Sequence, residues 1–286
     1  MNVLKKTILT CQDYTVSNES FDLILDEELD MLITSPQPSI DNLARYYESE
    51  KYISHTDSKQ TFFDRIYQTV KRVTISKKVK LIEGFIDSKL TEKSLLDIGC
   101  GTGDFLVGAK KRDWKLSGVE PNANARKRAQ QKTSHKIVED ISELDLCKYD
   151  VITLWHVLEH VPNLTEYISQ LKQLLKPEGV LLIAVPNYKS YDARYYGKFW
   201  AAYDVPRHLW HFSKKSIKGL FEKEKMEVVK IHPMLFDSFY VSLLSEKYKT
   251  ENQNPIKAFF VGLCSNILAI RSKEYSSHIY VLKNTR

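Results

Sequence analysis

Residues 95–105, LLDIGCGTGDF, decide the fold of this chain. An apolar run is followed by three glycines at alternate positions, Gly99, Gly101 and Gly103, and a helical pattern begins directly after the third. Strand, glycine turn and helix in this order are typical of a nucleotide-binding crossover. Glycines carry no Cβ, so the backbone can turn sharply and lie against a ligand. The next apolar run ends in Glu120, whose carboxylate can accept hydrogen bonds from both hydroxyls of a ribose.

The glycine spacing and two nearby acids narrow the choice of ligand. A dinucleotide fingerprint reads G-x-G-x-x-G, with the helix N-terminus facing a pyrophosphate. Here the spacing is G-x-G-x-G, Asp97 precedes the first glycine, and Asp104 opens the helix. Carboxylates at these positions would repel a pyrophosphate, which disfavours an NAD-dependent oxidoreductase. They suit a ligand with a positive charge and an ammonium group, and S-adenosylmethionine has both.

This stretch resembles the first motif of the class I S-adenosylmethionine-dependent methyltransferases. The resemblance implies S-adenosylmethionine as cofactor and an oxygen, carbon or nitrogen atom of a small molecule as methyl acceptor. Two alternatives stay open. One is an ordinary βα turn in another doubly wound domain. The other is a non-catalytic S-adenosylmethionine-binding module that acts through a partner, with residues 254–271 as its interaction surface.

The composition fits a globular cytosolic protein, and the family resemblance implies a small-molecule substrate. The 286 residues allow one large domain with a smaller addition, and the mild net charge of +6 does not indicate nucleic-acid binding. Four scattered cysteines suggest reduced thiols. The first residues lack the apolar core of a signal peptide, and the apolar stretch 258–270 is too short and too interrupted to span a bilayer. Monomer and homodimer are both open.

Apolar runs and amphipathic patterns alternate through the middle of the chain. We expect helices at 61–85, 104–112, 123–132, 164–176 and 214–224, and strands at 94–98, 115–119, 136–139, 149–154, 179–185 and 226–232. The alternation predicts a Rossmann-like α/β fold with a mostly parallel sheet covered on both faces. We expect Asn163 to cap the helix at 164–176 and Ser213 to cap the helix at 214–224. Pro177 and Gly179 are expected to end the helix at 164–176. The family resemblance implies seven strands, with 279–282 inserted antiparallel.

Ligands of such sheets bind at the carboxyl ends of the strands. Besides the glycine loop, the resemblance assigns cofactor contacts to residues at three further strand tips: Glu120, Pro121, Asp140, Ile141, Trp155 and His156. An acid such as Asp140 commonly accepts from the adenine amine in this family, and the apolar residue after it packs on the ring. Alternatively, Asp140 only caps the turn at Ser142.

Residues 156–160, HVLEH, follow the fourth strand and match a zinc-protease spelling, H-x-x-E-H. We reject that reading because the segment lies at a strand tip and has no evident third ligand. In related quinone-biosynthesis O-methyltransferases the matching E-x-x-E-H set can hold a divalent metal. Here His156 replaces the first acid, so we expect no metal and favour a structural Glu159–His160 pair bonded beneath the pocket.

Residues 196–212, YGKFWAAYDVPRHLWHF, are rich in aromatic and basic side chains and lie in the expected acceptor loop. Removing a proton from the acceptor needs a base, and histidine is the natural one near neutral pH. The catalytic candidates are His156, His208, Arg207 and His211. The alternative is that Trp200, Trp210 and Phe212 form a satellite core and that Arg207 pairs with Asp204.

We expect two regions, an N-terminal extension over residues 1–60 and a methyltransferase domain over 61–286, with an acceptor loop at 187–212 and a helical insertion at 234–272. The D-x-P-R-H-x-x-H-F pattern of the loop resembles a bacterial subgroup of class I enzymes, some with an N-terminal zinc ribbon. Asp26 and Leu29 stand at the cysteine positions, so we expect an irregular extension with a hairpin and no zinc. Tyr47 and Tyr52 are expected in a lid over the cofactor.

Overall fold

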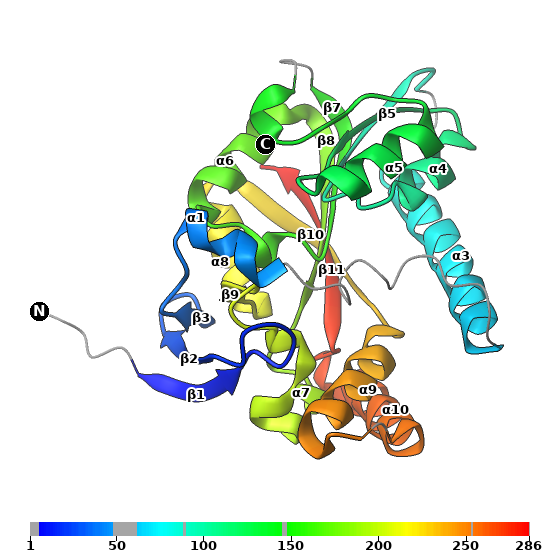
Figure 1. Cartoon of the computed structure of the whole chain (residues 1–286). Coiled ribbons are helices and arrows are strands. Elements are labelled where there is room, and N and C mark those ends of the chain that lie inside the picture. Colours follow the sequence, from blue (N-terminus) through cyan, green and yellow to red (C-terminus); the bar gives the residue numbers. More distant parts are fainter. Residues whose placement is uncertain (1–5, 48–61, 88–89, 145–147, 253, 286) are drawn as a thin grey trace, which may run out of the picture.

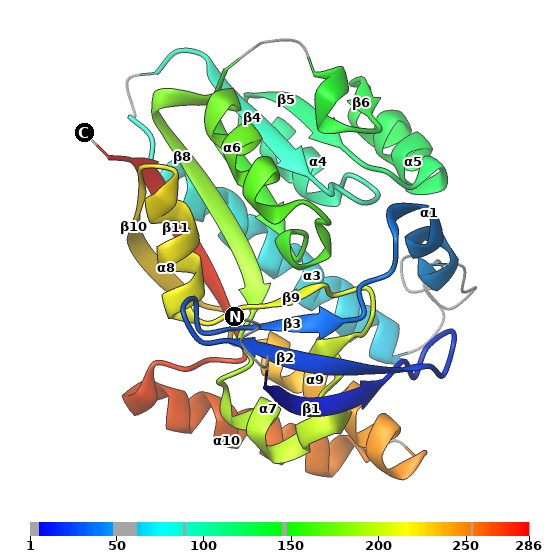
Figure 2. The ribbon, with the colours of Figure 1, turned by 90° about the vertical axis from the view of Figure 1, so that its left-hand side faces the viewer.

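The computed structural model describes residues 6–47, 62–87, 90–144, 148–252 and 254–285 (Figure 1). Tyr52 and most of the expected lid lie outside these ranges. The described elements form one large sheet with helices on both faces, a small sheet beside it, and a pair of helices at one end (Figures 1 and 2).

The large sheet has seven strands in the order β10-β11-β8-β7-β4-β5-β6. Their bounds are β4 (Lys93–Ile98), β5 (Trp114–Val119), β6 (Ile137–Val138), β7 (Tyr149–Trp155), β8 (Leu175–Pro186), β10 (Met226–Pro233) and β11 (Ser277–Asn284). β4 pairs in parallel with β5 and β7, whereas β11 pairs antiparallel with both β8 and β10. The expected inserted seventh strand and the Rossmann-like class are therefore confirmed.

Alternating side chains of the strands build one core on each face of this sheet. Leu95 faces one core and Leu96 the other, as the period of two in a strand requires. One face is covered by α3 (Phe62–Glu83), α4 (Asp104–Lys110) and α5 (Ala123–Thr133), and the other by α6 (Leu164–Leu174) and α8 (Lys214–Lys223). All five helices match the expected ones to within a few residues.

The N-terminal region contradicts the sequence-based expectation. Instead of irregular chain, it forms β1 (Thr7–Gln12), β2 (Ser20–Asp26) and β3 (Met31–Ser35), followed by the short helix α1 (Ile40–Leu43). The fourth strand of this antiparallel sheet is β9 (Trp210–His211), which comes from the acceptor loop. The expected hairpin is present, and the Oδ1 of Asp26 accepts from the Leu29 amide at 3.0 Å in its turn.

Two expected helix signals also fail. α6 ends at Leu174, before Pro177, because Leu175 is extended and already pairs with Tyr149 of β7. Asn163 precedes the helix but makes no side-chain cap. Ser213, in contrast, caps α8 through the Ser216 amide as expected.

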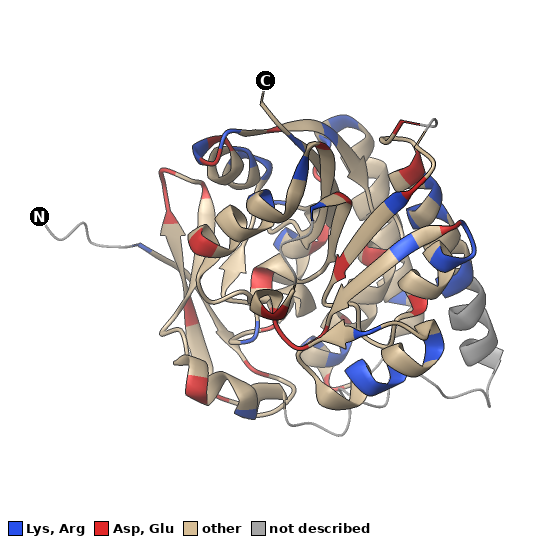
Figure 3. Ribbon diagram, turned by 90° about the horizontal axis from the view of Figure 1, so that it is seen from above, with Lys and Arg blue, Asp and Glu red and all other residues tan. Residues whose placement is uncertain are grey.

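The helical insertion consists of α9 (Asp237–Thr250) and α10 (Pro255–Ser272), which pack side by side. A Cβ at Gly262 of α10 would lie 2.8 Å from the Phe239 ring of α9, so glycine lets the two helices approach closely. None of the described helices is long and apolar enough to cross a membrane. Basic and acidic residues are interspersed on the face that Figure 3 shows.

Candidate cofactor and acceptor site

The predicted ribose acid and the glycine loop lie together at the strand tips. Glu120 is 9% exposed, and its carboxylate accepts from the amides of Gly101 and Asn122 at 2.8 and 2.9 Å. Burial raises the pKa of Glu120. Gly101 has φ +55°, and nothing lies within 4 Å of the place where a Cβ would be, so this side of the loop is open.

The underside of the glycine loop is closely packed. Gly99 has φ +66°, and a Cβ there would lie 2.4 Å from Cγ2 of Val157. Gly103 opens α4 with φ +78°. Asp97 is fully buried below the loop, where it accepts from the Thr153 hydroxyl at 2.7 Å. Burial raises the pKa of Asp97 to about 7, so this carboxyl can hold or release a proton near neutral pH.

Trp155, at the end of β7, presents an aromatic face that already binds a cation. The Nζ of Lys78, on α3, lies 4.0 Å from the centroid of the Trp155 ring, within the range of a cation–π interaction. Burial lowers the pKa of Lys78 to about 8, and Asp237 and Asp97 partly oppose this. The rings of Phe105 and Trp155 meet edge to face, with their centroids 5.4 Å apart. Lys78 belongs to none of the predicted motifs.

At the third strand tip, Asp140 caps the turn at Ser142, which was the alternative to its predicted contact with adenine. Its carboxylate accepts from the amide and the hydroxyl of Ser142, at 2.9 and 2.6 Å. These hydrogen bonds lower the pKa of Asp140. Ile141 is buried in the core and Pro121 is exposed. Asp140 thus has a structural task that does not depend on a ligand.

His156 lies between two carboxylates. Its Nε2 is 3.0 Å from Oδ2 of Asp237, and its Nδ1 is 3.4 Å from Oε1 of Glu159. Burial alone would lower the pKa of His156, but the two carboxylates outweigh it and raise the pKa to about 10. The backbone at His156 is left-handed, with φ +59°, a strained conformation that often marks functional positions. A histidine held protonated in this way cannot accept a proton near pH 7, which argues against the base role predicted for it.

Glu159, His160 and His208 form a cluster whose candidate ligand atoms all lie within 4.8 Å of one another. Glu159 is completely buried. Its Oε1 faces Nδ1 of His156 at 3.4 Å, but neither carboxylate oxygen makes a hydrogen bond of normal geometry with a described residue. Burial would raise the pKa of Glu159, but the surrounding imidazoles outweigh this and lower it. The hydrogen-bonded Glu159–His160 pair that we expected is therefore absent from the described residues.

The tautomers of both histidines follow from their hydrogen bonds. Nδ1 of His160 lies 3.1 Å from the carbonyl of Arg207, and Nδ1 of His208 lies 2.8 Å from the carbonyl of Ala202. A carbonyl only accepts, so each Nδ1 carries a proton, and in the neutral form of either imidazole the lone pair is on Nε2. Burial and the neighbouring His208 lower the pKa of His160 to about 4. Tyr47, a predicted lid residue, also reaches His160, with its hydroxyl 3.0 Å from Nδ1.

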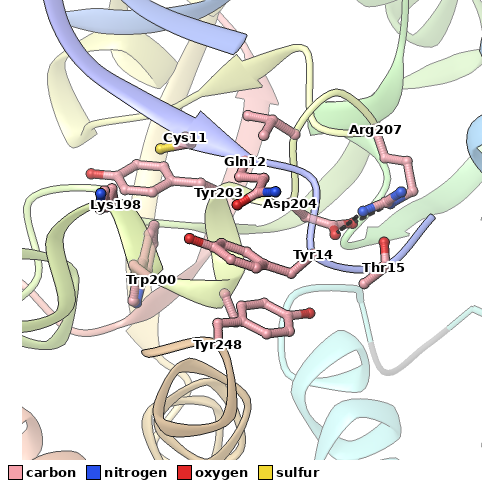
Figure 4. Close-up of a pocket in the computed structure, with 12 residues that line it drawn as sticks. Cys11, Gln12, Tyr14, Thr15, Lys198, Trp200, Tyr203, Asp204, Arg207 and Tyr248 are labelled. Carbon is pink, nitrogen blue, oxygen red and sulfur yellow. Dashed lines mark hydrogen bonds and ion pairs between the residues drawn. The ribbon is translucent and has the colours of Figure 1, made fainter. Parts of the chain in front are cut away.

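Arg207 is a structural anchor, as the alternative interpretation had it. All three of its guanidinium nitrogens are bound: Nε and Nη2 to Asp204, Nη2 also to Asp13, and Nη1 to the carbonyl of Tyr46. Figure 4 shows the pair with Asp204 beside a cavity of about 10 Å³, room for a water and no more. Asp13 belongs to the turn after β1, so Arg207 joins the small sheet to the loop.

His211 and the loop aromatics are structural as well. The Thr34 hydroxyl donates to the His208 carbonyl at 2.7 Å, so His211 Nε2, 3.0 Å away, must donate to Thr34. Burial lowers the pKa of His211 well below its usual range. Trp200, in the bend after α7 (Tyr191–Tyr196), is buried and donates to Asp192 at 2.7 Å. Nε2 of His208 lies 3.9 Å from Oδ2 of Asp204, which is beyond hydrogen-bond distance.

The cluster fits a divalent ion. Two imidazole nitrogens and a carboxylate are common protein ligands of transition-metal ions. Ligating histidines usually donate their other ring nitrogen to a carbonyl or carboxylate, as His160 and His208 do here. The third ligand comes from a loop distant in sequence, so the pattern of residues 156–160 could not reveal it. Asp237 was missed for the same reason.

Comparisons with known proteins identify the family of this chain. A family model described as "Methyltransferase domain" matches residues 67–231, more than half of the chain. A ubiquinone biosynthesis O-methyltransferase of Actinobacillus pleuropneumoniae serotype 7 is 29% identical over 175 residues, which cover 56% of this chain and 74% of that protein. Its counterpart in Histophilus somni is 35% identical over 111 residues, covering 34% of this chain and 47% of that protein.

Solved structures share the fold. Magnesium protoporphyrin IX methyltransferase from Synechocystis PCC 6803 has a TM-score of 0.53 at 15% identity, covering 86% of this chain and 94% of that one. Geranyl diphosphate C-methyltransferase from Streptomyces coelicolor A3(2) has a TM-score of 0.55 at 15% identity, covering 80% and 86%. With the glycine loop, the inserted antiparallel strand and the matching family model, this chain belongs to the class I S-adenosylmethionine-dependent methyltransferases.

Proposed function

We propose that this chain transfers the methyl group of S-adenosylmethionine to a hydroxyl oxygen of a small molecule. The observation that carries the proposal is that residues 156–160 contact both the glycine loop and the cluster of Glu159, His160 and His208. Val157 packs beneath Gly99 of the glycine loop, and Glu159, two residues later, lies in the cluster with His160 and His208. One short segment therefore connects the expected cofactor site to a set of proton-accepting groups.

The cofactor side is supported by the contacts of Glu120. Its two amide partners hold the carboxylate at the open side of the glycine loop, where it can accept from ribose hydroxyls. Trp155 lies at the tip of β7 with Lys78 over its ring, and an aromatic face is the kind of surface that attracts a cation such as a sulfonium. The cofactor brings the electrophile, and the protein contributes alignment and a place for the proton.

On the acceptor side, His208 is our candidate for the group that takes the proton. Its Nδ1 proton is fixed on the Ala202 carbonyl, which leaves the Nε2 lone pair for an acceptor hydroxyl. His156 stays protonated between its two carboxylates and keeps Glu159 in position. With a divalent ion bound by Glu159, His160 and His208, Nε2 of His208 would be a metal ligand and not the base, and the ion's positive charge would instead favour a deprotonated acceptor oxygen.

Calorimetry and a transfer assay test the proposal together. We expect S-adenosylmethionine and S-adenosylhomocysteine to bind to the purified chain and NAD not to bind. Radiolabelled methyl transfer should then be detected to members of a panel of phenols, catechols and aliphatic alcohols. Binding without transfer to any oxygen, carbon or nitrogen acceptor would favour the non-catalytic binding module. Binding of NAD alone would overturn the proposal.

The metal is tested separately from the transfer. Mn²⁺ added to chelator-treated protein should give a bound-ion signal in electron paramagnetic resonance, and Glu159→Gln should abolish it. The matched control is Glu166→Gln, since Glu166 is an exposed acid on α6. If wild-type protein binds no Mn²⁺, Mg²⁺ or Zn²⁺, the cluster works through the His208 lone pair alone.

A further inference from the structure

Helix α10 is packed with its small residues inside and its large apolar residues outside. The buried positions are Ala258, Val261, Gly262, Ser265 and Ala269, which recur every three or four residues and form one face of the helix. Because α10 and α9 are neighbours, this face is used for helix packing. The sequence of α10 is largely apolar, so its remaining large apolar side chains lie on the opposite face.

That opposite face is exposed and hydrophobic. Six large apolar side chains of α10 are between 49% and 72% exposed: Ile256, Phe259, Phe260, Ile267, Leu268 and Ile270. Leu235 and Phe236, just before α9, and Tyr240 within it are also about half exposed. We call these nine residues the apolar patch. They are nine of the sixteen exposed large apolar residues in the described ranges, so the surface hydrophobicity is concentrated here.

The charges around the patch are mainly basic. α10 contains no acidic residue. Lys247 and Lys249 are exposed in the last turn of α9, near the start of α10, and Arg271 and Lys273 are exposed at its end. Lys77 of α3 lies 5.8 Å from the Phe236 ring.

The acids nearby do little to balance these cations. Glu246 is buried and pairs with Lys257 at 3.1 Å. Glu251 is exposed in the turn between α9 and α10. A partner for this surface should therefore offer an apolar layer bordered by negative charge.

We propose that the apolar patch docks this protein onto the surface of an anionic phospholipid bilayer. α10 would lie in the plane of the interface, with its aromatic and aliphatic side chains among the acyl chains and its basic ends at the lipid phosphates. A second copy of the chain complements the patch less well. In a two-fold dimer the patch meets itself, and its basic ends would find Glu251 as the exposed acid of the same surface.

The patch adjoins the candidate acceptor site. Phe236 precedes Asp237, whose carboxylate holds His156. A docked chain would therefore bring this side of the molecule close to the bilayer. The docking itself does not rest on the proposed methyl transfer, since it follows from exposure and charge alone, and it is measured without a substrate.

Vesicle co-sedimentation tests the docking. We expect the whole chain to bind vesicles with 30% phosphatidylglycerol in phosphatidylcholine at least about 10-fold more tightly than pure phosphatidylcholine vesicles, and the difference to shrink in high salt. Phe260→Ser with Ile267→Ser should weaken binding by about 10-fold or more. Val229→Ser with Ile231→Ser, two exposed apolar residues of β10, is the matched control and should bind like wild type.

Three outcomes would overturn the proposal. They are equal affinity for neutral and anionic vesicles, no binding to either, and unchanged binding by the α10 double variant. Sedimentation velocity adds a decisive comparison. A wild-type dimer that dissociates in the α10 double variant would assign the patch to a second copy instead. Circular dichroism and calorimetric binding of S-adenosylmethionine should stay unchanged in both double variants, which separates lost docking from misfolding and from a failed cofactor assignment.

Discussion

The Nε2 atom of His156 lies 3.0 Å from Oδ2 of Asp237, which joins the tip of the fourth parallel strand to the first turn of the helical insertion. The carboxylates of Asp237 and Glu159 keep the pKa of His156 at about 10, against an ordinary value of 6.5. The stabilisation by this raised pKa is complete below pH 6.5 and disappears as the pH rises toward 10.

Asp237→Asn should lower the pKa of His156 substantially, which nitrogen NMR of the imidazole can measure. The variant should lose about 1 kcal/mol of unfolding free energy at pH 6, because the hydrogen bond to a charged group is removed from a site that is one third exposed. The loss should fade by pH 10. Asp113→Asn, at an exposed position, is the control. An unchanged His156 titration would refute the assigned pairing.

Glu120→Ala should weaken S-adenosylmethionine binding by about 1–3 kcal/mol, since two ribose hydroxyls lose a charged partner. Gly101→Val should weaken it further, because φ +55° is strained for valine and its side chain would enter the open space beside the loop. Isothermal titration calorimetry measures both. Glu139→Ala, which removes an exposed acid paired with Arg126, should bind normally. Normal affinity in both site variants would remove this site.

His208→Ala should lower turnover by about 100- to 10,000-fold while cofactor affinity stays nearly normal, because a positioned base contributes on that order. Steady-state kinetics with the identified acceptor, together with calorimetry, give the two quantities. His135→Ala, remote from the cluster, is the matched histidine control. Full turnover by His208→Ala would show that the acceptor loses its proton by another route.

Arg207→Ala should destabilise the fold by about 3–5 kcal/mol, because it leaves Asp13 and Asp204 without their buried cation. Urea unfolding measures the change. Arg112→Ala removes a half-exposed pair with Glu83 and should cost no more than about 1 kcal/mol. A similar small effect in both variants would contradict the anchoring role of Arg207.

The sequence predicts the large sheet well because its signals are local. The glycine loop, the alternating apolar runs and the Ser213 cap each depend on a few adjacent residues. Of the small sheet only a hairpin was predicted, since its fourth strand, at Trp210, comes from a distant segment. The same limit applies to the site. Glu120 was found by its distance from the glycines, whereas the contacts of His156 with Asp237 and of Glu159 with His208 exist only in three dimensions.

The position of β9 has a consequence for how the protein is made. Strands β1 to β3 are translated before β9, yet Leu32 and Ile33 must wait for Trp210 and His211 to complete their ladder, and Asp13 must wait for Arg207. Such long sequence separations slow folding and leave a strand edge unpaired during synthesis. The small sheet can therefore reach its final structure only after residues 207–211 have been translated.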